Sequence, residues 1–158
     1  DALAITLLQA RGFGRDDYAK LHPAGAIGRA LLLRVRDIMR TGPRLATVPW
    51  TARVSDAVVA MTRARAGSVA VVDQRGRLAG IFTDGDLRRQ LAAGLHPGER
   101  PIAEVMTRQP VCVEADRLAV DVLRMFREHA IDDLVVVDEG GRVVGMVDLQ
   151  DLPRLKLL

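Results

Sequence analysis

Thr83 and Asp86 are side chains whose types and spacing suggest ligand binding. They stand three positions apart in Gly-Ile-Phe-Thr-Asp-Gly-Asp-Leu (80–87), where a hydrophobic stretch gives way to a polar one. This pattern predicts a strand that ends on a hydroxyl and a helix that begins with carboxylates. The hydroxyl can accept a hydrogen bond from an unpaired amide of the first helical turn. One turn later, Asp86 returns to the same face, where its carboxylate could accept both hydroxyls of a ribose.

Arg88 and Arg89 follow this pair and extend its chemistry to anions. A guanidinium offers charge-assisted hydrogen bonds to a phosphate, and amides at a helix amino terminus favour anionic groups. We therefore expect these arginines, together with Thr83 and Asp86, to face a nucleotide or a nucleotide sugar. The simpler interpretation is that the Thr83 hydroxyl only caps the helix, and capping and ligand binding are compatible.

The same pattern occurs a second time. Gly-Met-Val-Asp-Leu-Gln-Asp-Leu (145–152) repeats it 65 positions later, so that Asp148 takes the place of Thr83 and Asp151 that of Asp86. A carboxylate at position 148 can cap a helix as a hydroxyl does. The recurrence predicts a tandem repeat.

The elements that would position these side chains also occur twice. The first copy reads as a helical turn (35–39), an extended piece (47–49), an amphipathic helix, two strands joined by a turn (69–82) and a closing helix. Ser55 and Asp56 can cap the amphipathic helix, and Gly67 is expected to end it. The second copy repeats these elements, and the linker between the copies (92–101) is rich in Gly and Pro.

Each repeat is then a βαββα unit with a three-stranded sheet that is covered on one face only. Two such sheets packed face to face would bury their strands and create two related clefts. The sequence therefore predicts one α+β body with pseudo-twofold symmetry over residues 35–156. The methionines at 39, 61, 106 and 125 are expected to fill the core or the interface and not to bind a metal.

The composition is that of a soluble globular protein. The 158 residues are 49% hydrophobic with a net charge of +3, and they lack the roughly 18 consecutive apolar residues of a membrane-spanning helix. Cys112 is the only cysteine, so no internal disulfide can form and a cytoplasmic location is expected; its valine neighbours predict a buried strand position. The arginines alternate with acids and are not interleaved with aromatics, which argues against nucleic-acid binding. The chain starts at Asp1 without a secretory signal, so we expect a fragment or a processed product.

The repeated features resemble a pair of CBS domains. The resemblance rests on two copies of Asp/Glu-Ile/Val-Met, a helix, Val-Val-Asp, a Gly-containing turn, Gly-hydrophobic-hydrophobic and a terminal Asp. It implies domains at 35–92 and 101–156, a disc that assembles as a homodimer or homotetramer, and nucleotide binding where Thr/Ser-x-x-Asp holds the phosphate and the ribose. Thr83 and Asp86 match this motif. Asp148 departs from it and would repel a phosphate, so Asp148 and Asp151 are expected to form a weaker second cleft.

His22 is the candidate for acid–base chemistry in the amino-terminal part. Pro23 disfavours helical backbone angles at residue 22, and a polar side chain filling a turn is the simpler interpretation. However, His-Pro-Ala-Gly-Ala-Ile-Gly-Arg-Ala-Leu-Leu (22–32) and the CBS pair together resemble the carboxyl-terminal half of arabinose 5-phosphate isomerases of the KpsF/KdsD type. The resemblance implies that residues 1–33 end a sugar isomerase (SIS) domain and that His22 is an active-site residue, although Ala24 replaces the usual Gly.

This second resemblance also implies a function. The whole protein would interconvert ribulose 5-phosphate and arabinose 5-phosphate for Kdo and lipopolysaccharide synthesis, without a catalytic cofactor. Most of the SIS domain is absent from the sequence, so the chain alone is expected to be inactive.

The identity of the ligand stays open between several alternatives. CMP-Kdo, a downstream product with both a ribose and anionic groups, is the leading ligand. AMP or ATP is the alternative, although no arginine precedes either Val-Val-Asp strand to serve a triphosphate. A purely structural dimerisation module remains possible, and a free-standing CBS protein that regulates another partner fits poorly with the His22 motif.

Overall fold

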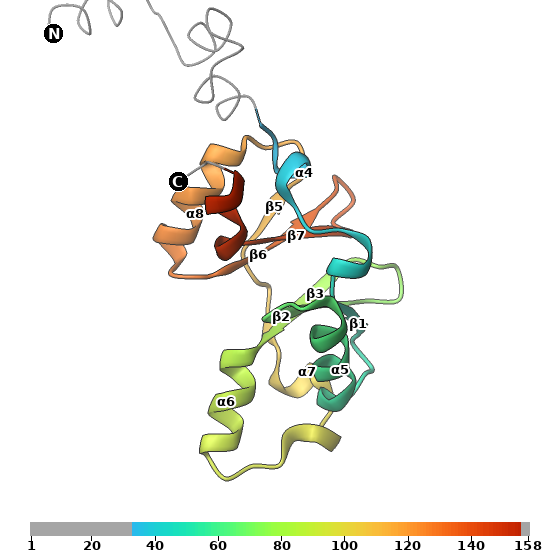
Figure 1. The fold of residues 1–158 in the computed structure, drawn as a ribbon. Coiled ribbons are helices and arrows are strands. Elements are labelled where there is room, and N and C mark those ends of the chain that lie inside the picture. Colours follow the sequence, from blue (N-terminus) through green and yellow to red (C-terminus); the bar gives the residue numbers. More distant parts are fainter. Residues whose placement is uncertain (1–32, 156–158) are drawn as a thin grey trace, which may run out of the picture.

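The computed structural model describes residues 33–155, with side chains as far as Leu152. These residues form two stacked lobes, each with its sheet toward the other lobe and its helices on the outer side (Figure 1). The predicted α+β tandem arrangement is therefore confirmed.

Both repeats contain the predicted elements in the predicted order. The first consists of α4 (Val35–Ile38), η1 (Gly42–Arg44), β1 (Thr47–Pro49), α5 (Val54–Ala64), β2 (Ser68–Val72), β3 (Leu78–Thr83) and α6 (Asp84–Ala92). After η2 (Pro97–Glu99), the second consists of α7 (Ile102–Val105), β4 (Thr107–Arg108), β5 (Cys112–Glu114), α8 (Ala119–His129), β6 (Asp133–Val137), β7 (Val143–Asp148) and η3 (Leu149–Leu155).

The two sheets share one topology. β2 pairs in parallel with β1 and antiparallel with β3, and β6 pairs in the same way with β5 and β7. The first sheet gains a fourth strand, because β4 pairs with the outer edge of β3, so the expectation of three strands holds only for the second sheet. At the equivalent edge of the second sheet, Arg40 forms a single bridge with Met146.

The short helix that opens each repeat packs on the other repeat. Val35 and Ile38 of α4 are buried in the core of the second repeat, whereas Ile102 of α7 is buried in the core of the first. The Val35 amide donates a hydrogen bond to the carbonyl of Arg117 at 2.8 Å, and the Ile102 amide donates to the carbonyl of Ala52 at 2.8 Å. In Figure 1, α4 accordingly lies in the lobe with β5, β6 and β7, and α7 lies in the lobe with α5.

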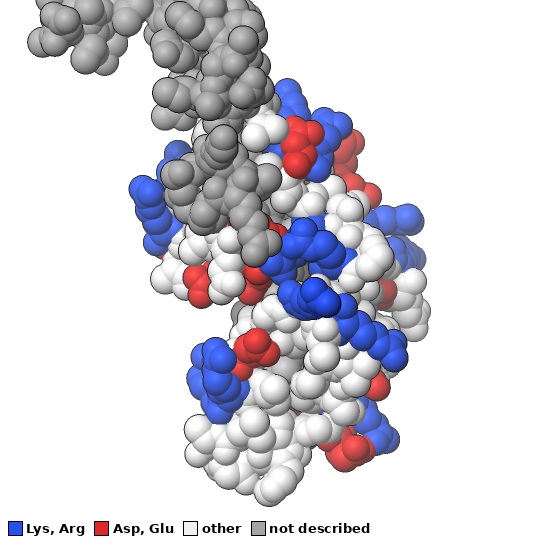
Figure 2. All heavy atoms as spheres, viewed as in Figure 1, with Lys and Arg blue, Asp and Glu red and all other residues white. Residues whose placement is uncertain are grey.

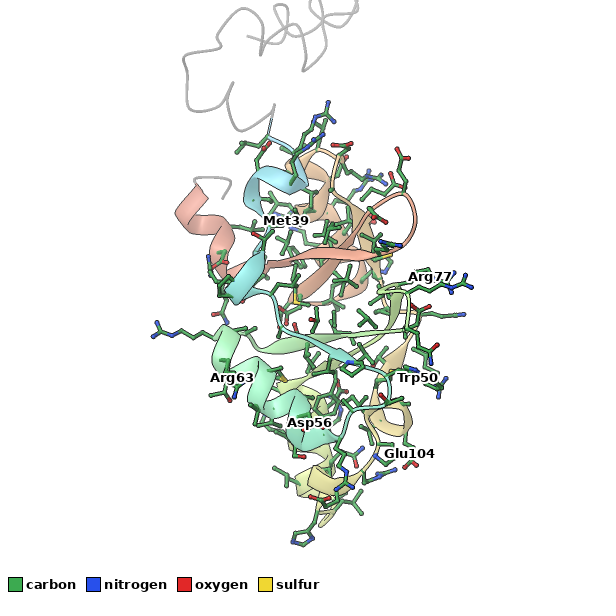
Figure 3. The ribbon with its side chains drawn as sticks, turned by 90° about the vertical axis from the view of Figure 1, so that its right-hand side faces the viewer. Met39, Trp50, Asp56, Arg63, Arg77 and Glu104 are labelled. Atoms are coloured by element: carbon green, nitrogen blue, oxygen red, sulfur yellow. The ribbon has the colours of Figure 1, made fainter. Side chains whose placement is uncertain are left out.

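Each exchanged segment ends on a methionine that lies over a glycine of the other repeat. A Cβ atom at Gly145 would come within 2.5 Å of the Met39 sulfur, and one at Gly80 within 2.5 Å of the Met106 sulfur. Met39 therefore lies inside the lobe of the second repeat (Figure 3). The prediction that the methionines fill the core or the interface is confirmed at these positions and at Met61, which is 4% exposed.

Buried side chains from both sheets meet in the centre of the molecule. This cluster consists of Ala70, Ile81, Val135, Val137 and Met146. The hairpin tips also pair with each other at the edge of this layer, where Arg77 lies opposite Arg142 and extends outward (Figure 3). The predicted face-to-face packing of the sheets is thus confirmed.

The end of the long helix differs from the expectation. Gly67 does not end α5; Arg65 does, in a left-handed conformation with φ of 52°, and its amide donates to the carbonyls of Met61 and Thr62. At the start of the helix, the Asp56 carboxylate accepts a hydrogen bond from the amide of Arg53, the residue just before α5, at 2.9 Å, as a capping residue should. The prediction from Gly67 was wrong because the backbone leaves the helical conformation at Arg65, two residues earlier.

Two expectations for the second repeat were wrong. Cys112 is exposed and not buried, because β5 has three residues and its central Val113 is the one that faces the core at 3% exposure. The closing element is the 3-10 helix η3 and not an α-helix. Pro153 accounts for the difference, since it has no N–H and its ring clashes with the carbonyl four residues earlier in an α-helix.

Candidate nucleotide-binding sites

Thr83 and Asp86 form a reciprocal cap at the start of α6. The Asp86 amide donates to the Thr83 hydroxyl oxygen at 3.2 Å, and the Thr83 amide donates to Asp86 Oδ2 at 2.9 Å. The Thr83 hydroxyl also donates to Asp86 Oδ2 at 2.8 Å. The structure therefore brings the two predicted residues together, and one carboxylate oxygen is engaged within this capping box.

The other oxygen of Asp86 pairs with one of the predicted arginines. Arg89 Nη2 lies 2.5 Å from Asp86 Oδ1, and the Arg89 side chain is 73% exposed whereas that of Asp86 is 14% exposed. Arg88 is exposed and has no salt bridge within residues 33–155. An exposed ion pair of this kind contributes little to stability, so Arg89 can exchange Asp86 for an anionic ligand at small cost.

Two further hydroxyls belong to this region. Thr107 on β4 lies opposite Ile81, two residues before the end of β3, and Ser68 lies opposite Thr83 across β2 and β3. Neither residue was predicted from the sequence. We call Ser68, Thr83, Asp86 and Thr107 site 1.

The equivalent residues of the second repeat are bound to an arginine of the first. Arg40 Nη2 lies 2.7 Å from Asp148 Oδ2, and Arg40 Nε lies 2.6 Å from Asp151 Oδ2. Arg44 adds a contact of 3.0 Å to the same oxygen of Asp151. Arg40 is 8% exposed and Asp148 and Asp151 are 12% and 14% exposed, so this is a shielded ion-pair network.

The electrostatics of this network are consistent with its geometry. The hydrogen bond from Arg40, together with its charge, lowers the pKa of Asp151, and the same bond together with the charge of Asp148 raises the pKa of Arg40. Arg40 and Asp151 are therefore ionised at neutral pH. Asp148 also keeps a capping role, because its Oδ1 accepts a hydrogen bond from the Gln150 amide at 2.8 Å.

Asp133 is a further carboxylate near this network, at the start of β6. It lies opposite Asp148 in the β6–β7 register, and its Oδ1 is shielded from solvent without a hydrogen-bond partner in the described part of the chain. Burial and the negative charge of Asp148 raise the pKa of Asp133 to about 6, against the opposing effects of the Ser68 hydroxyl and the Arg40 charge. We call Arg40, Asp133, Asp148 and Asp151 site 2.

Sites 1 and 2 are equivalent in the backbone and opposite in chemistry. The bridge between Arg40 and Met146 corresponds to the pairing of Thr107 with Ile81, so Arg40 and Thr107 occupy equivalent places. Ser68 and Thr83 of site 1 are hydroxyls where site 2 has Asp133 and Asp148, whereas Asp86 and Asp151 are carboxylates in both sites. Sequence reasoning missed Arg40, although aligning Met39 with Met106 places Arg40 against Thr107.

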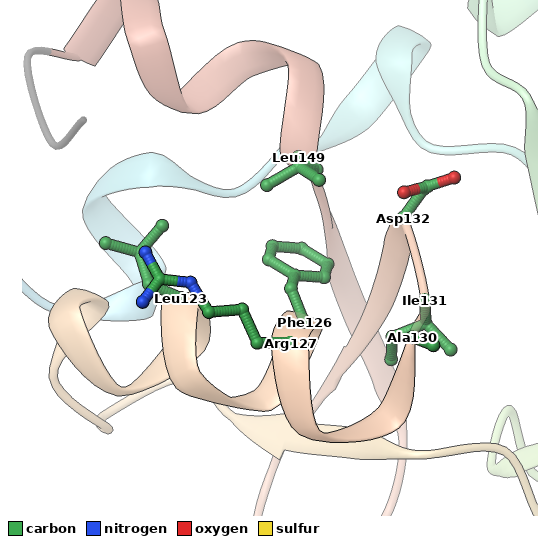
Figure 4. Close-up of a pocket in the computed structure, with 7 residues that line it drawn as sticks. All are labelled: Leu123, Phe126, Arg127, Ala130, Ile131, Asp132 and Leu149. Atoms are coloured by element: carbon green, nitrogen blue, oxygen red, sulfur yellow. The ribbon is translucent and has the colours of Figure 1, made fainter.

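An apolar pocket lies away from both sites. It has a volume of about 380 Å³ and opens between the end of α8 and the start of η3 (Figure 4). No predicted binding residue of the described chain lines it. Its walls are formed by Leu123, Phe126, Ala130, Ile131 and Leu149, with Arg127 and Asp132 as its charged members.

The remaining surface gives no sign of a metal centre or a membrane segment. Positive and negative side chains are interspersed on the face shown in Figure 2. Among the described residues, no group of three or more acids, cysteines or histidines is placed to hold a metal ion. No helix in residues 33–155 has the length and apolar character needed to cross a bilayer. His22 and the rest of the predicted SIS remnant lie outside the described residues.

Sequence comparison identifies the repeats. The profile described as "CBS domain" matches residues 35–93 and 102–156, which is most of the chain. The chain belongs to the CBS domain family. The resemblance predicted from the two motif copies is thereby confirmed.

Relatives of the whole chain extend this result. Arabinose 5-phosphate isomerase KdsD of Pseudomonas aeruginosa is 46% identical over 154 residues, which are 98% of this chain and 47% of that protein. The chain therefore spans about half the length of this relative. The resemblance to arabinose 5-phosphate isomerases is confirmed over the CBS pair and the segment before it.

Solved CBS pairs share the fold. The CBS domain pair of protein MJ0100, in complex with 5'-methylthioadenosine and S-adenosylmethionine, is 28% identical with a TM-score of 0.70 and covers 79% of this chain and 96% of its own. The CBS protein PAE2072 of Pyrobaculum aerophilum, complexed with AMP, is 20% identical with a TM-score of 0.69 and covers 79% of this chain and 98% of its own. The second similarity concerns the fold alone.

Proposed function

We propose that this CBS pair is the regulatory part of an arabinose 5-phosphate isomerase and that it binds a nucleotide or nucleotide sugar at site 1. The observation that carries the proposal is the Thr83–Asp86 pair, in which a shielded carboxylate is matched with hydroxyls and one exposed arginine. The identity of 46% with a KdsD isomerase over nearly all of the chain supports the choice of enzyme.

Binding would use the capping box without dismantling it. Asp86 Oδ2 stays in the cap, while Oδ1 exchanges its bond to Arg89 for the hydroxyls of a ribose. Arg89 is then free to turn toward a phosphate, and Arg88 adds positive charge beside it. Hydrogen bonds to charged groups are each worth about 1.5 to 3 kcal/mol, so losing the carboxylate should weaken binding by one to two orders of magnitude.

CMP-Kdo is the ligand that we favour, since its ribose suits Asp86 and its anionic groups suit the arginines. Adenine nucleosides are the alternative, and the adenosyl ligands named for the MJ0100 pair support that class. Residues 66–68, where β2 begins, read Ala-Gly-Ser and offer no cation for a triphosphate. AMP is therefore favoured over ATP within the alternative.

The proposal extends to the rest of the chain. CBS domains at 35–92 and 101–156 would form homodimers or homotetramers of a cytoplasmic enzyme, and residues 1–33 would end its SIS domain with His22 at the active site. A purely structural dimerisation module is the second candidate. Exposed apolar side chains on the helical side of the first repeat favour it, namely Val59, Leu91 and Leu95 at 49%, 53% and 44% exposure.

Calorimetry of the 158-residue chain with CMP-Kdo, CMP, AMP and ATP tests the proposal. We expect binding of at least one of them, a 10- to 100-fold weaker affinity in Asp86→Ala, and little change in Asp84→Ala, since Asp84 is exposed in the same helical turn. Absence of binding by all four ligands would refute sensing. If, in addition, the unaltered chain forms an oligomer that Asp86→Ala does not form, the result would favour the structural module. We also expect no isomerase turnover from this chain.

A further inference from the structure

Each of the three guanidinium nitrogens of Arg40 already has a partner among the described residues. Its Nη2 and Nε are bound to Asp148 and Asp151 at 2.7 and 2.6 Å, and Nη1 lies 3.4 Å from the Arg65 carbonyl. The side chain is 8% exposed. A phosphate that approached site 2 would therefore meet a guanidinium whose positive charge is already balanced by two carboxylates.

The backbone holds Arg40 at this place. Its amide donates to the Met146 carbonyl at 2.7 Å, and its carbonyl accepts from the Met146 amide at 3.1 Å. The neighbouring Met39 lies directly over Gly145. The guanidinium can therefore leave site 2 only if the side chain breaks two shielded ion pairs, and such pairs are costly to break from one side.

The carboxylates bound by Arg40 are the counterparts of the ligand-binding groups of site 1. Asp148 is equivalent to Thr83, and Asp151 is equivalent to Asp86. In site 1, Asp86 is the residue that would bind the ribose. Arg40 thus occupies in site 2 the groups that a nucleotide needs in site 1. The uncharged Thr107 stands at the equivalent place in site 1 and leaves Asp86 available.

We propose that Arg40 is an internal occupant of site 2 and is the residue that closes this site to nucleotides. Asp148 alone does not close it, because replacing Asp148 by Thr leaves Arg40 bound to Asp151. Replacing Arg40 by Thr does not open it either, because Asp133, Asp148 and Asp151 then repel a phosphate with only Arg44 to offset them. Opening site 2 requires both changes, Arg40→Thr and Asp148→Thr, which give site 2 the threonines of site 1 at these two positions and leave Asp133 where site 1 has Ser68.

The test rests on the proposed function of site 1 and uses AMP as the probe, with stoichiometry measured by calorimetry in the 158-residue chain. Asp86→Ala is expected to weaken AMP binding at site 1 by 10- to 100-fold, and AMP is used at concentrations where this weakened site stays empty. In that background we expect the double variant to bind one AMP per chain and each single variant to bind none. Circular dichroism and a cooperative melt confirm that each variant is folded.

The outcomes separate the two proposals. If the unaltered chain binds no AMP, the adenine-nucleotide form of the proposed function fails, whereas a folded double variant that gains no AMP overturns the role of Arg40. Binding by either single variant also overturns it. A measurement on the unaltered chain avoids the question of whether a variant folds. The NMR signal of the Arg40 Nε–H proton should exchange slowly with solvent and should keep its chemical shift at saturating AMP. A change in that chemical shift would contradict internal occupancy.

Discussion

Asp133 lies directly opposite Asp148 at the open end of the antiparallel β6–β7 pair. Like charges at directly opposed positions destabilise a sheet, and Asp133 Oδ1 has no hydrogen-bond partner among the described residues to offset the repulsion. The equivalent rung of the first repeat holds Ser68 opposite Thr83, which carries no charge. The charged rung is tolerated because Arg40 lies against Asp148.

Replacing Asp133 by Asn should stabilise the protein at neutral pH. The pKa of Asp133 is about 6 in the folded state and 3.8 ordinarily, so the folded state binds the proton more tightly. The resulting gain in the free energy of unfolding is fully present below pH 4 and is lost as the pH rises through 6. We expect Asp133→Asn to raise the free energy of unfolding at pH 7.5 by up to about 3 kcal/mol and to remove this pH dependence between 4 and 6. Urea titrations at several pH values measure it, with Asp132→Asn as the control; an unchanged pH profile would contradict the assignment.

Arg40→Ala should be strongly destabilising. Removal of one partner leaves Asp148 and Asp151 shielded from water without their main counter-charge, and losses of about 3 to 5 kcal/mol are typical. The matched control is Arg36→Ala, whose exposed ion pair with Asp116 should contribute less than about 1 kcal/mol. Chemical denaturation of both variants gives the comparison, and equal losses would argue against a special role for Arg40.

Gly80→Ala should disturb the contact between the repeats. A Cβ atom there would lie 2.5 Å from the Met106 sulfur and 2.9 Å from the Thr107 carbonyl oxygen, and overpacking of this kind costs about 1 to 3 kcal/mol. Adding Met106→Ala should not restore stability, because the backbone carbonyl remains in place. Gly98→Ala is the control, since nothing lies within 4 Å of its added methyl group. Full rescue by the double change would show that the methionine alone sets the spacing.

Thr83→Val should lower stability by about 1 to 2 kcal/mol, because the isosteric side chain cannot accept from the Asp86 amide. Thr83→Ser keeps the hydroxyl and should change stability by less than about 0.5 kcal/mol. Thermal melts of the two variants separate the capping role from ligand binding. A neutral Thr83→Val would mean that the cap is dispensable and that Thr83 is retained for the ligand alone.

Cys112 should react with thiol reagents in the folded protein, because it is exposed. Partial burial and the charge of Glu114 raise the pKa of its thiol above 9.0, so the thiolate fraction is small at pH 8. We expect the rate of labelling to keep rising above pH 9 and to be higher in Glu114→Gln. A rate that levels off below pH 8 would contradict the raised pKa.

The local elements were predictable because each has a local cause. Hydrophobic runs bounded by turn residues predicted the strands, and the hydroxyl at position 83 predicted the helix cap that the structure shows. The reciprocal bond from the Thr83 amide to Asp86 was not predicted. The end of α5 was missed because Arg65 adopts a left-handed conformation that its residue type does not announce. The exposure of Cys112 was missed because a short strand at a sheet edge does not bury alternate residues on both faces.

The composition of site 2 was not predictable in the same way. Asp148 and Asp151 were singled out from the repeat, but their partner Arg40 lies 111 residues before Asp151 in the sequence. Only the exchange of α4 and α7 brings Arg40 near them. Alignment of the repeats places Arg40 against Thr107, which is one change from an uncharged to a charged residue. Asp148 stands at the position of Thr83 and is a second such change, of opposite sign, in the same site. These two compensating charge changes between the repeats could have predicted that Arg40 pairs with the carboxylates of site 2.

The exchange of α4 and α7 also decides how the molecule can be divided. A fragment cut at the boundary of the second repeat would lack Val35 and Ile38, two buried side chains of its own core, and the first repeat alone would lack Ile102. Neither half is thus a self-sufficient folding unit, although each is a complete copy of the sequence motif. The two copies should therefore unfold in a single transition. Because α4 follows residue 33 and packs in the core of the second repeat, a movement of residue 33 would reach the second repeat before the first.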